Sequence, residues 1–520
     1  MIVAMPLATT ELSAPELARE LEDFLADNPT SAILEDGRVL FDMRSTRYSL
    51  STEQGRCLLH LWSEERNVVR RISGLEHRKH SLRLETRRFG QVRPQVLEIA
   101  ANLNRRPAST RDAARTKYLR LLERVLHKSF HGWIPDGFRT AADLEHSFGP
   151  AYARGVMNRG SSAWSVIAVN SQESQPMIDG ILTLGILWLA YCRERSDGRV
   201  YRGIRILVPP GTGRTTCARL PWLNDAANFE IYELDERSEE LKQLDVHDSG
   251  NIHAKLAHAF DPQSALERFQ PGIDRVLGLL VPGLRAATEV RPRSTTEITF
   301  GLYGLEYARI RHGFAHGSFG RRDEITFGAG ANETPLTSET EELFQELTQR
   351  LFENRHASGS RRNPLYRLQP ERWLESVLRM DISGIEPALR ADIVYSQVPA
   401  FAAGDRAMLD LLTLTHTGRL AVLELKADDN LHLPLQALDY WWRVRRLQHE
   451  DAFRKHGYFP GIRLSHEPPL LYLIAPALRI HPSTDLVLRH FSPEVHWELI
   501  GINEDWRKRR KVILRKRAAS

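Results

Sequence analysis

Two short apolar runs on either side of a turn signal constrain the fold more than any other part of this chain. Residues 406–414 read RAMLDLLTL and residues 419–427 read RLAVLELKA. Between them lies Thr-His-Thr-Gly, which places Gly418 where a tight turn favours glycine. Runs of this length and composition are typical of β-strands. The sequence therefore predicts a β-hairpin.

The register of this hairpin decides which side chains meet. If Leu414 lies opposite Leu420, the same register places Asp410 opposite Glu424, and directly opposed Cβ atoms are about 5 Å apart. Lys426 is two residues beyond Glu424, so it points to the same face of the sheet. We expect these three ionisable side chains to converge, while the leucines beside them face the core.

Two carboxylates at this separation repel each other, and an apolar hairpin keeps both only if a cation compensates. Mg²⁺ suits the position because it takes oxygen ligands and is often held by one or two carboxylates plus substrate phosphate oxygens. We therefore expect Asp410 and Glu424 to bind Mg²⁺ or Mn²⁺. Lys426 would hold a water in line with a phosphorus atom and offset the developing charge. The predicted reaction is phosphodiester hydrolysis.

Amphipathic helices are predicted on both sides of the hairpin. Pro370 suits a first helical position and begins the segment PERWLESVLRM (370–380), in which Glu371, Glu375 and Arg379 share the polar face. The segment 433–447, LPLQALDYWWRVRRL, is also expected to be helical. Its Trp441 and Trp442 fit either a packed core or base stacking.

In order, LDLL, a turn, VLELKA and QALDY resemble the PD-(D/E)XK, or restriction-endonuclease-like, nuclease superfamily. The spacing of Gln436 and Tyr440 resembles its RecB-type QxxxY branch. The resemblance covers roughly residues 363–500 and implies an α-β-β-β-α-β core. It also implies that Asp410 and Glu424 bind Mg²⁺, that Lys426 assists the water, and that Gln436 and Tyr440 support the site or the DNA.

Two further points belong to this resemblance. Glu375 matches the acidic residue that many members carry on the first helix, although an ion pair with Arg379 explains it equally well. Leu409 stands where the eponymous proline would be, a variation that the superfamily commonly shows. The predicted catalytic set is therefore Asp410, Glu424, Lys426, Glu375, Gln436 and Tyr440.

The 520 residues are long enough for several domains, and mixed helix and strand signals predict an α/β (mixed α+β), multidomain chain. We divide it into residues 1–105 (small basic α+β domain), 106–245 (α/β domain), 246–355 (connecting region), 356–364 (linker) and 365–520 (nuclease-like domain). In the first domain we expect a helix at 14–27 and a helical stretch after Thr52. The linker is expected because HASGSRRNP is small, polar and ends in proline.

The second domain has a possible relationship to the nuclease-like one. Aligning residues 166–180 with residues 422–436 pairs Ala168 with Glu424 and Asn170 with Lys426, and an apolar helix follows each segment. The catalytic pair is missing there. Residues 106–245 are thus either an inactive relative of the nuclease unit or unrelated α/β structure.

A net charge of +5, with twelve Lys/Arg against five Glu in residues 56–106, makes a polyanionic partner plausible. That basic cluster fits a solvated face or a phosphate-contacting surface equally well. The same choice applies to the eight Lys/Arg in residues 507–517, which could grip a phosphate backbone or keep an edge strand soluble.

Two motifs are weaker. VPPGTGRTT (208–216) followed by IYELDE (231–236) resembles the phosphate loop and Walker B strand of an NTPase, but Val208 and Arg214 replace the required Gly and Lys. His312 and His316 have the spacing of a helical zinc pair, yet flanking glycines favour a loop. The three cysteines are too few and scattered for a disulfide framework.

Three hypotheses about function follow. The first is a metal-dependent hydrolase that cuts nucleic acid, with DNA as the expected substrate. The second is a non-catalytic nucleic-acid-binding or scaffold protein that retains the nuclease fold, and the remote third is a P-loop-like NTPase. Without a signal peptide or an 18-residue apolar run, we expect a cytoplasmic protein with no membrane segment. The oligomeric state is left open.

Overall fold

The computed structural model describes residues 13–35, 38–43, 46–53, 56–62, 67–78, 81–87, 95–101, 108–141, 148–196, 198–247, 254–314, 321–328, 333–402 and 405–518. These residues form helices and four β-sheets, so the predicted mixed α/β, multidomain class is confirmed. The chain divides into two compact units, residues 1–111 with 260–369 and residues 112–259 with 370–520.

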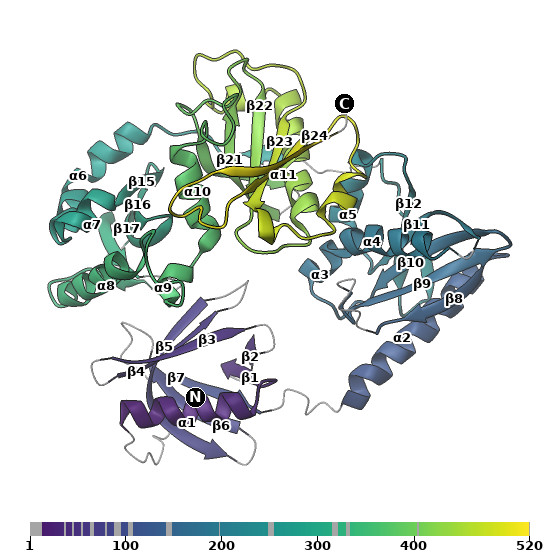
Figure 1. Cartoon of the computed structure of the whole chain (residues 1–520), viewed down its shortest axis with the longest axis horizontal. Coiled ribbons are helices and arrows are strands. Elements are labelled where there is room, and N and C mark those ends of the chain that lie inside the picture. Colours follow the sequence, from purple (N-terminus) through teal and green to yellow (C-terminus); the bar gives the residue numbers. More distant parts are fainter. Residues whose placement is uncertain are drawn as a thin grey trace. The chain divides into compact units, whose positions relative to one another are not determined.

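The first unit begins with a seven-stranded sheet of order β2-β1-β7-β6-β5-β4-β3. Its elements are α1 (Ala14–Asp27), β1 (Ala32–Glu35), β2 (Arg38–Asp42), β3 (Arg47–Glu53), β4 (Arg56–Trp62), β5 (Asn67–Arg78), β6 (Ser81–Arg87) and β7 (Gln95–Ala100). Helix α1 lies across the sheet (Figure 1), with Leu17, Leu21 and Leu25 buried at helical spacing. The helix at 14–27 is thus confirmed. The helical stretch predicted after Thr52 is wrong, because residues 56–62 pair on both sides as β4.

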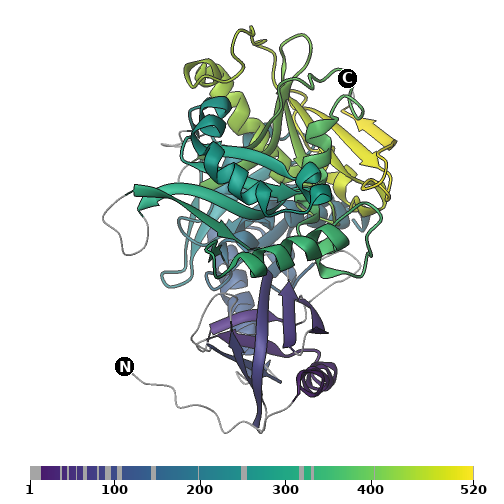
Figure 2. The ribbon, with the colours of Figure 1, turned by 90° about the vertical axis from the view of Figure 1, so that its left-hand side faces the viewer.

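A five-stranded sheet of order β15-β16-β17-β18-β19 completes the first unit, and in Figure 2 its teal strands pack against helices. Its elements are α6 (Pro262–Gly278), α7 (Pro282–Ala287), β15 (Glu289–Ser294), β16 (Glu297–Leu302), β17 (Leu305–Phe314), β18 (Arg321–Phe327), β19 (Thr334–Pro335), α8 (Glu341–Asn354) and α9 (Pro364–Arg367). Phe300, Tyr307 and Phe344 form part of its own core. The region expected to connect two domains is therefore a folded α/β unit.

The predicted linker at 356–364 is also part of this fold. Just before it, the buried guanidinium of Arg355 donates hydrogen bonds to the carbonyl oxygens of Leu302 (2.9 Å) and Leu368 (2.6 Å). At its end, the Asn363 side chain accepts a hydrogen bond from the Leu365 N–H and caps α9. These contacts fix the segment at both ends, and the boundary between the units falls at residues 369 and 370.

The second unit contains two sheets. The first has the order β13-β12-β11-β10-β9-β8. Its elements are α2 (Ala108–Ser129), β8 (Ile134–Arg139), β9 (Tyr152–Arg159), β10 (Ser162–Val169), α3 (Gln175–Asp179), α4 (Ile181–Glu194), β11 (Val200–Val208), α5 (Arg214–Arg219), the 3₁₀ turn η2 (Leu220–Trp222), β12 (Asn228–Asp235) and β13 (Glu240–Gln243). Helix α4 is apolar on nearly every side, as expected for a helix that is covered all round.

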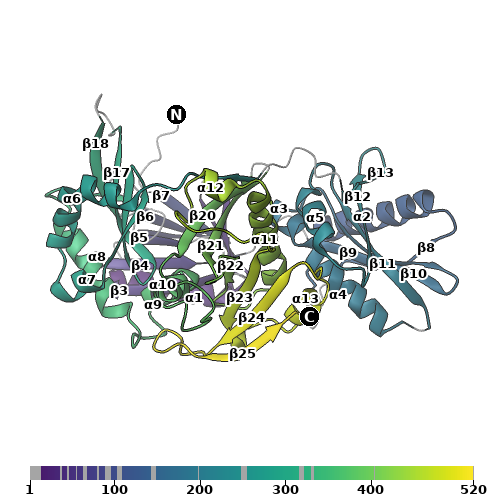
Figure 3. The same ribbon diagram turned by 90° about the horizontal axis from the view of Figure 1, so that it is seen from above.

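The other sheet has the order β14-β20-β21-β22-β23-β24-β25. Its elements are β14 (Ala254–Leu256), α10 (Pro370–Met380), β20 (Tyr395–Ala402), β21 (Asp405–Leu414), β22 (Leu420–Leu425), α11 (Leu433–His449), α12 (Ala452–Lys455), β23 (Leu470–Pro476), η3 (Ala477–Arg479), α13 (Thr484–Leu488), β24 (His496–Ile502) and β25 (Val512–Arg517). Figure 3 shows β21, β22 and β23 side by side, with α11 running along them. The element order α-β-β-β-α-β is present from α10 to β23.

One hydrophobic core joins the two sheets of the second unit. It contains Ile167 and Ile206 from the first sheet, and Val422 and Leu473 from the second. Strand β14 adds to the connection, because Ala254–Leu256 pairs with β20 although it precedes that strand by well over a hundred residues. The expected division at residue 245 therefore differs from the structure, in which residues up to 259 belong with 370–520.

Candidate functional site

The predicted hairpin register is present. Strands β21 and β22 pair antiparallel with Leu414 opposite Leu420 and Leu411 opposite Leu423, and the same register places Asp410 opposite Glu424. Gly418 closes the turn with a φ of 81°. The Asp410 carboxylate is oriented by the next residue of β22, because its Oδ2 accepts a hydrogen bond of 3.0 Å from the backbone N–H of Leu425. The two carboxylates thus lie on neighbouring strands and share one face.

Glu424 is the buried member of the pair. Its side chain is 2% exposed, and its Oε1 lies 3.2 Å from the Nζ of Lys426. Its Oε2 is buried without a hydrogen-bond partner among the described residues. Burial, with Asp410 adding a like charge, raises the pKa of Glu424 well above its ordinary value, against the opposing effect of Lys426. An orphaned buried carboxylate oxygen is costly unless a further ligand satisfies it.

Lys426 is the cation of the site and is 13% exposed. Burial alone would lower its pKa, but the carboxylates of Glu424, Glu371 and Asp410 outweigh that effect and raise the pKa. Its backbone N–H donates to the carbonyl oxygen of Ile474 at 3.0 Å, which fixes the end of β22 against β23. Lys426 therefore stays protonated at neutral pH and is held at the rim of the site.

Glu371 joins the site from the first turn of α10, a contact that sequence reasoning did not assign. Its Oε1 lies 3.6 Å from the Nζ of Lys426, and its side chain is 47% exposed. Desolvation raises the pKa of Glu371, with Lys426 opposing and Asp410 adding to the rise. Sequence reasoning placed Glu371 on the polar face of this helix but assigned the catalytic role to Glu375 on the same face.

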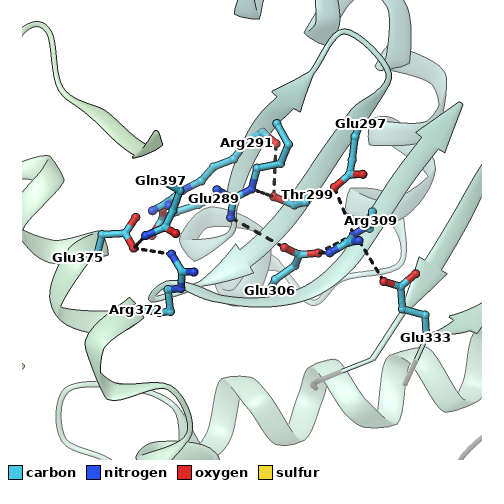
Figure 4. A network of polar contacts seen from close by, with 11 residues as sticks. Glu289, Arg291, Glu297, Thr299, Glu306, Arg309, Glu333, Arg372, Glu375 and Gln397 are labelled. Atoms are coloured by element: carbon cyan, nitrogen blue, oxygen red, sulfur yellow. Dashed lines mark hydrogen bonds and ion pairs between the residues drawn. The ribbon is translucent and has the colours of Figure 1, made fainter. Parts of the chain in front are cut away.

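Glu375 lies one helical turn further along and faces a different set of partners (Figure 4). Its Oε2 accepts hydrogen bonds from Arg372 (2.9 Å) and from the Nε2 of Gln397 (2.8 Å). The same Gln397 amide lies 3.4 Å from the Oδ1 of Asp410. Glu375 is therefore connected to the Asp410 carboxylate through one side-chain amide, and Arg372 of the same helix also contacts it.

Gln397 was missed by sequence reasoning, as was its strand β20. It has a φ of 54°, in the left-handed region that non-glycine residues rarely adopt. The neighbouring pairs Ser396 with Leu411 and Val398 with Leu409 place it opposite Asp410, where the ladder is interrupted. Unusual backbone of this kind persists only where surrounding contacts determine it. Here the contacts are those of its side-chain amide.

The QxxxY residues lie on α11. Gln436 is partly buried, and its Oε1 has no hydrogen-bond partner among the described residues. Burial raises the pKa of Tyr440, with Glu424 and Asp410 as the next contributors, so its hydroxyl stays protonated beside the carboxylates. Trp441 and Trp442 are buried, and the Trp441 Nε1–H donates to the carbonyl oxygen of Pro469. These two tryptophans are core residues and are not available for base stacking.

The carboxylates offer oxygen ligands, as Mg²⁺ and Mn²⁺ prefer. Among the described residues, no group of three or more His, Cys, Asp or Glu side chains is arranged to hold a metal ion by itself. Two carboxylates are enough for Mg²⁺, which commonly completes its shell with waters and phosphate oxygens. The unpartnered Oε2 of Glu424 and the adjacent Asp410 therefore fit such an ion.

The basic segments are largely neutralised where the structure describes their side chains. Arg70 in β5 is buried against Glu35 at 3.1 Å. In the C-terminal segment, Arg515 contacts Glu386 and Glu498, Lys516 contacts Asp485, and Arg517 contacts Glu498. Ion pairing on the edge strand β25 favours a structural role for this segment over a phosphate grip. Several residues of the 56–106 cluster, such as Lys79 and Arg88, lie outside the described residues.

The two weaker motifs gain no support as ligand sites. In the segment 208–216, the Gly211 N–H donates to the Oε1 of Glu233 at 2.7 Å, so a carboxylate of the chain occupies the place of a phosphate. His312 lies on strand β17 with its Nδ1 2.7 Å from Asp323, and His316 lies outside the described residues. The helical spacing of a zinc pair does not apply on a strand.

A scan against protein-family models gives no match, and a search of curated proteins gives no significant match. No helix among the described residues has both the length and the apolar character needed to span a membrane. The assignment of function therefore rests on the site itself.

Proposed function

We propose that residues 370–520 form a PD-(D/E)XK-type nuclease domain that hydrolyses phosphodiester bonds in nucleic acid, with DNA as the substrate. One combination of features carries the proposal. The hairpin register, continued by one pair beyond Leu411 and Leu423, sets Asp410 opposite Glu424. One buried oxygen of Glu424 has no hydrogen-bond partner among the described residues, and the Nζ of protonated Lys426 lies 3.2 Å from the same carboxylate. This combination is costly for stability and suits a site that awaits a cation and a phosphate.

Asp410 and Glu424 would hold Mg²⁺ or Mn²⁺. When bound, the ion supplies a Lewis acid for the phosphoryl oxygen and lowers the pKa of a bound water. The Leu425 N–H and the Gln397 amide orient the Asp410 carboxylate for this role. Without these hydrogen bonds, the aspartate could rotate away from the shared face.

Lys426 and Tyr440 supply the remaining chemistry. The ammonium group of Lys426 donates hydrogen bonds, so it orients the attacking water or stabilises the charge that develops on the phosphate oxygens. Glu371 keeps this ammonium protonated and directed to the site. Tyr440 also remains protonated, so its hydroxyl can donate to a phosphate oxygen of the bound strand.

The test is cleavage of DNA by the purified full-length protein with Mg²⁺ or Mn²⁺, with and without a chelator. We expect metal-dependent cutting that Lys426→Ala abolishes while DNA binding is retained. As a matched control, Lys455→Ala removes a lysine whose described contact is the backbone oxygen of Glu450 on the exposed surface, and it should cut normally. Equal cutting by Lys426→Ala would refute the assignment. Salt-sensitive binding with no cleavage under any metal would favour the non-catalytic alternative.

A further inference from the structure

The two sheets of the second unit repeat one topology. In each sheet, three strands pair antiparallel in succession (β8, β9, β10 and β20, β21, β22). Two parallel pairings follow (β10, β11, β12 and β22, β23, β24), and then an antiparallel edge strand (β13 and β25). Helices occupy equivalent places in the chain: α4 and α11 after the third strand, α5 and α13 after the fourth. We call residues 112–243 the first repeat and residues 370–517 the second repeat.

The repeats meet through a reciprocal set of backbone contacts. Leu223 and Phe491 form an antiparallel bridge, and Phe491 lies 268 residues after Leu223. The flanking hydrogen bonds, both 2.8 Å, run from Asn224 N–H to the His490 oxygen and from Ser492 N–H to the Trp222 oxygen. The same offset of 268 residues converts the first of these bonds into the second. Any antiparallel bridge has such a local two-fold axis, but here the same offset also converts Asn228, the first residue of β12, into His496, the first residue of β24. The bridge therefore joins equivalent segments of the two repeats.

The helices obey the same exchange. Helix α4 packs against α13, and its counterpart α11 packs against α5, the counterpart of α13. In Figure 3 the labels α4, α13, α11 and α5 lie together where the two sheets meet. Thr183 in the first turn of α4 also contacts His432, the N-cap residue of α11, with 3.1 Å between Oγ1 and Nδ1. The second unit therefore has the architecture of an isologous dimer built into one chain.

The offset of 268 residues aligns β12 with β24, and the cross-strand pairs then show which residues of the first repeat occupy the places of the catalytic residues. Ile231 in β12 corresponds to Leu499 in β24. From Ile231, the cross-strand partners in order are Ile206, Ile167 and Arg154. From Leu499, the same steps reach Leu473 and Glu424, and the hairpin register then reaches Asp410. Ile167 therefore stands in the place of Glu424, and Arg154 in the place of Asp410.

This correspondence corrects the alignment made from the sequence, which paired Ala168 with Glu424 and was wrong by one residue. Ile167 and Val169 belong to the core shared by the two repeats, as Val422 does, whereas Ala168 packs on the opposite face with Leu122 and Val125 of α2. A slip of one residue moves a side chain to the other face of a strand. With the corrected register, Val169 occupies the place of Lys426.

The first repeat cannot hold a divalent cation at this place. Ile167 and Val169 provide no ligand atoms, and the buried guanidinium of Arg154 carries a positive charge where Asp410 would carry a negative one. Arg154 is 1% exposed, donates to the Ala141 carbonyl oxygen at 2.7 Å, and lies over the Phe148 ring at 4.5 Å. A buried guanidinium therefore occupies the place that a carboxylate has in the second repeat.

We propose that the second unit is a fused pseudo-dimer with one catalytic site, so that each encounter with duplex DNA cuts one strand. The inference rests on the proposed function. A nuclease dimer with two intact sites matches the two-fold symmetry of the duplex and places one site at each strand. Here the second repeat supplies Asp410, Glu424 and Lys426, and the first repeat has no equivalent catalytic groups.

The test uses supercoiled plasmid in large excess over the full-length protein with Mn²⁺. We expect nicked circles to accumulate to most of the substrate before linear DNA forms, because linear DNA requires two independent encounters. Linear DNA formed from the start, in parallel with nicked circles, would overturn the one-site proposal while leaving the nuclease assignment intact. No cutting of any DNA would instead refute the proposed function.

A second substrate tests the proposal for a nuclease that cuts only from the ends of DNA. A blunt linear duplex with a different fluorophore on each strand, again in excess, should yield molecules in which one strand is shortened and the other is full length. Simultaneous loss of both strands would contradict the proposal. The variant Glu424→Gln then separates the repeats. If the first repeat had its own site, this variant would still nick plasmid, whereas one site predicts no nicking above background.

Discussion

At the scale of single residues, the placement of Glu424 conflicts with stability. Its carboxylate is buried, its Oε2 lacks a hydrogen-bond partner among the described residues, and Asp410 faces it across the hairpin. Lys426 compensates in part. A buried acid of this kind is a feature of sites in which a ligand completes the charge balance.

The first prediction concerns the pH dependence of stability without metal. The pKa of Glu424 is raised in the folded state, so folding favours its neutral form. The contribution of this group to the free energy of unfolding is therefore complete below about pH 4.5 and is lost as the pH rises through the folded-state pKa. In Glu424→Gln that loss is removed, so the variant should melt about 2–4 °C above the wild type at neutral pH in a chelator. The difference should shrink toward pH 4.5.

Thermal unfolding followed by circular dichroism between pH 4.5 and 8 measures this difference. Glu467→Gln is the matched control, because Glu467 is 67% exposed beside Arg419 and its removal should change the melting temperature little. A Glu424→Gln variant that melts below the wild type throughout this range would contradict the account of the buried carboxylate.

The second prediction concerns Gln397, whose amide connects Glu375 and Asp410. Hydrogen bonds to charged groups contribute about 1.5–3 kcal/mol, so Gln397→Ala should slow metal-dependent cleavage roughly 10- to 100-fold. Gln397→Gly loses the same amide, but glycine accepts the φ of 54° without strain. It should therefore be more stable than the alanine variant and equally slow. Activity that follows stability across the pair would argue against a positioning role.

The residues of the candidate site differ in how far the sequence can predict them. Asp410, Glu424 and Lys426 follow from one hairpin register, which local turn chemistry and apolar patterning set. Glu371 was placed on the correct helix face, but the resemblance favoured Glu375 on that face, so the contact of Glu371 with Lys426 was not predicted. Gln397 could not be found, because its role depends on strand β20. Pro399 obscures the β pattern of that strand, and the left-handed backbone of Gln397 leaves no signal in the sequence.

At the scale of elements, helices with strong periodicity were predictable, and α1 and α10 match their expected bounds. Strand β4 was not, because its sequence RCLLHLW has apolar residues at spacings that fit a helix or a strand. Strand β14 has three residues and forms only because β20 is available as a partner. Long-range pairing of this kind leaves no local signal.

The third prediction is made for helix α11. Trp441 is fully buried, packs edge-on against Trp222 at 5.0 Å between ring centroids, and donates a hydrogen bond to Pro469. Trp441→Ala should therefore lower the free energy of unfolding by about 3–5 kcal/mol, as large-to-small core changes do. Denaturant unfolding measures the loss, with Arg446→Ala on the partly exposed face of the same helix as control. An unchanged unfolding midpoint with weakened single-strand binding would instead indicate a base-stacking role.

At the scale of the whole molecule, the second unit depends on segments that are far apart in the chain. Its two repeats share one core, and Arg219 of α5 forms a pair of hydrogen bonds, 2.6 and 2.9 Å, with Asp439 of α11. Both side chains are largely buried. Because α5 belongs to the first repeat and α11 to the second, this ion pair joins the halves of the proposed pseudo-dimer.

The fourth prediction concerns the ion pair between Arg219 and Asp439. Arg219→Met leaves the Asp439 charge buried without its ion-pair partner, which should cost about 3–5 kcal/mol of unfolding free energy. The loss should appear in a single unfolding transition for residues 112–259 and 370–520. Arg454→Met, which removes the exposed pair with Asp451, should cost less than about 1 kcal/mol. Two separate transitions, of which only one responds to Arg219→Met, would show that the repeats fold independently.

The central claim is that Asp410 and Glu424 form a metal site beside Lys426, and a crystal of the full-length protein soaked with Mn²⁺ tests it most directly. The predicted result is an anomalous difference peak within coordination distance, about 2.0–2.3 Å, of oxygens from both carboxylates. The peak should vanish in crystals of Glu424→Gln. Strong anomalous peaks elsewhere with none at this pair, or carboxylates that point away from each other, would contradict the account.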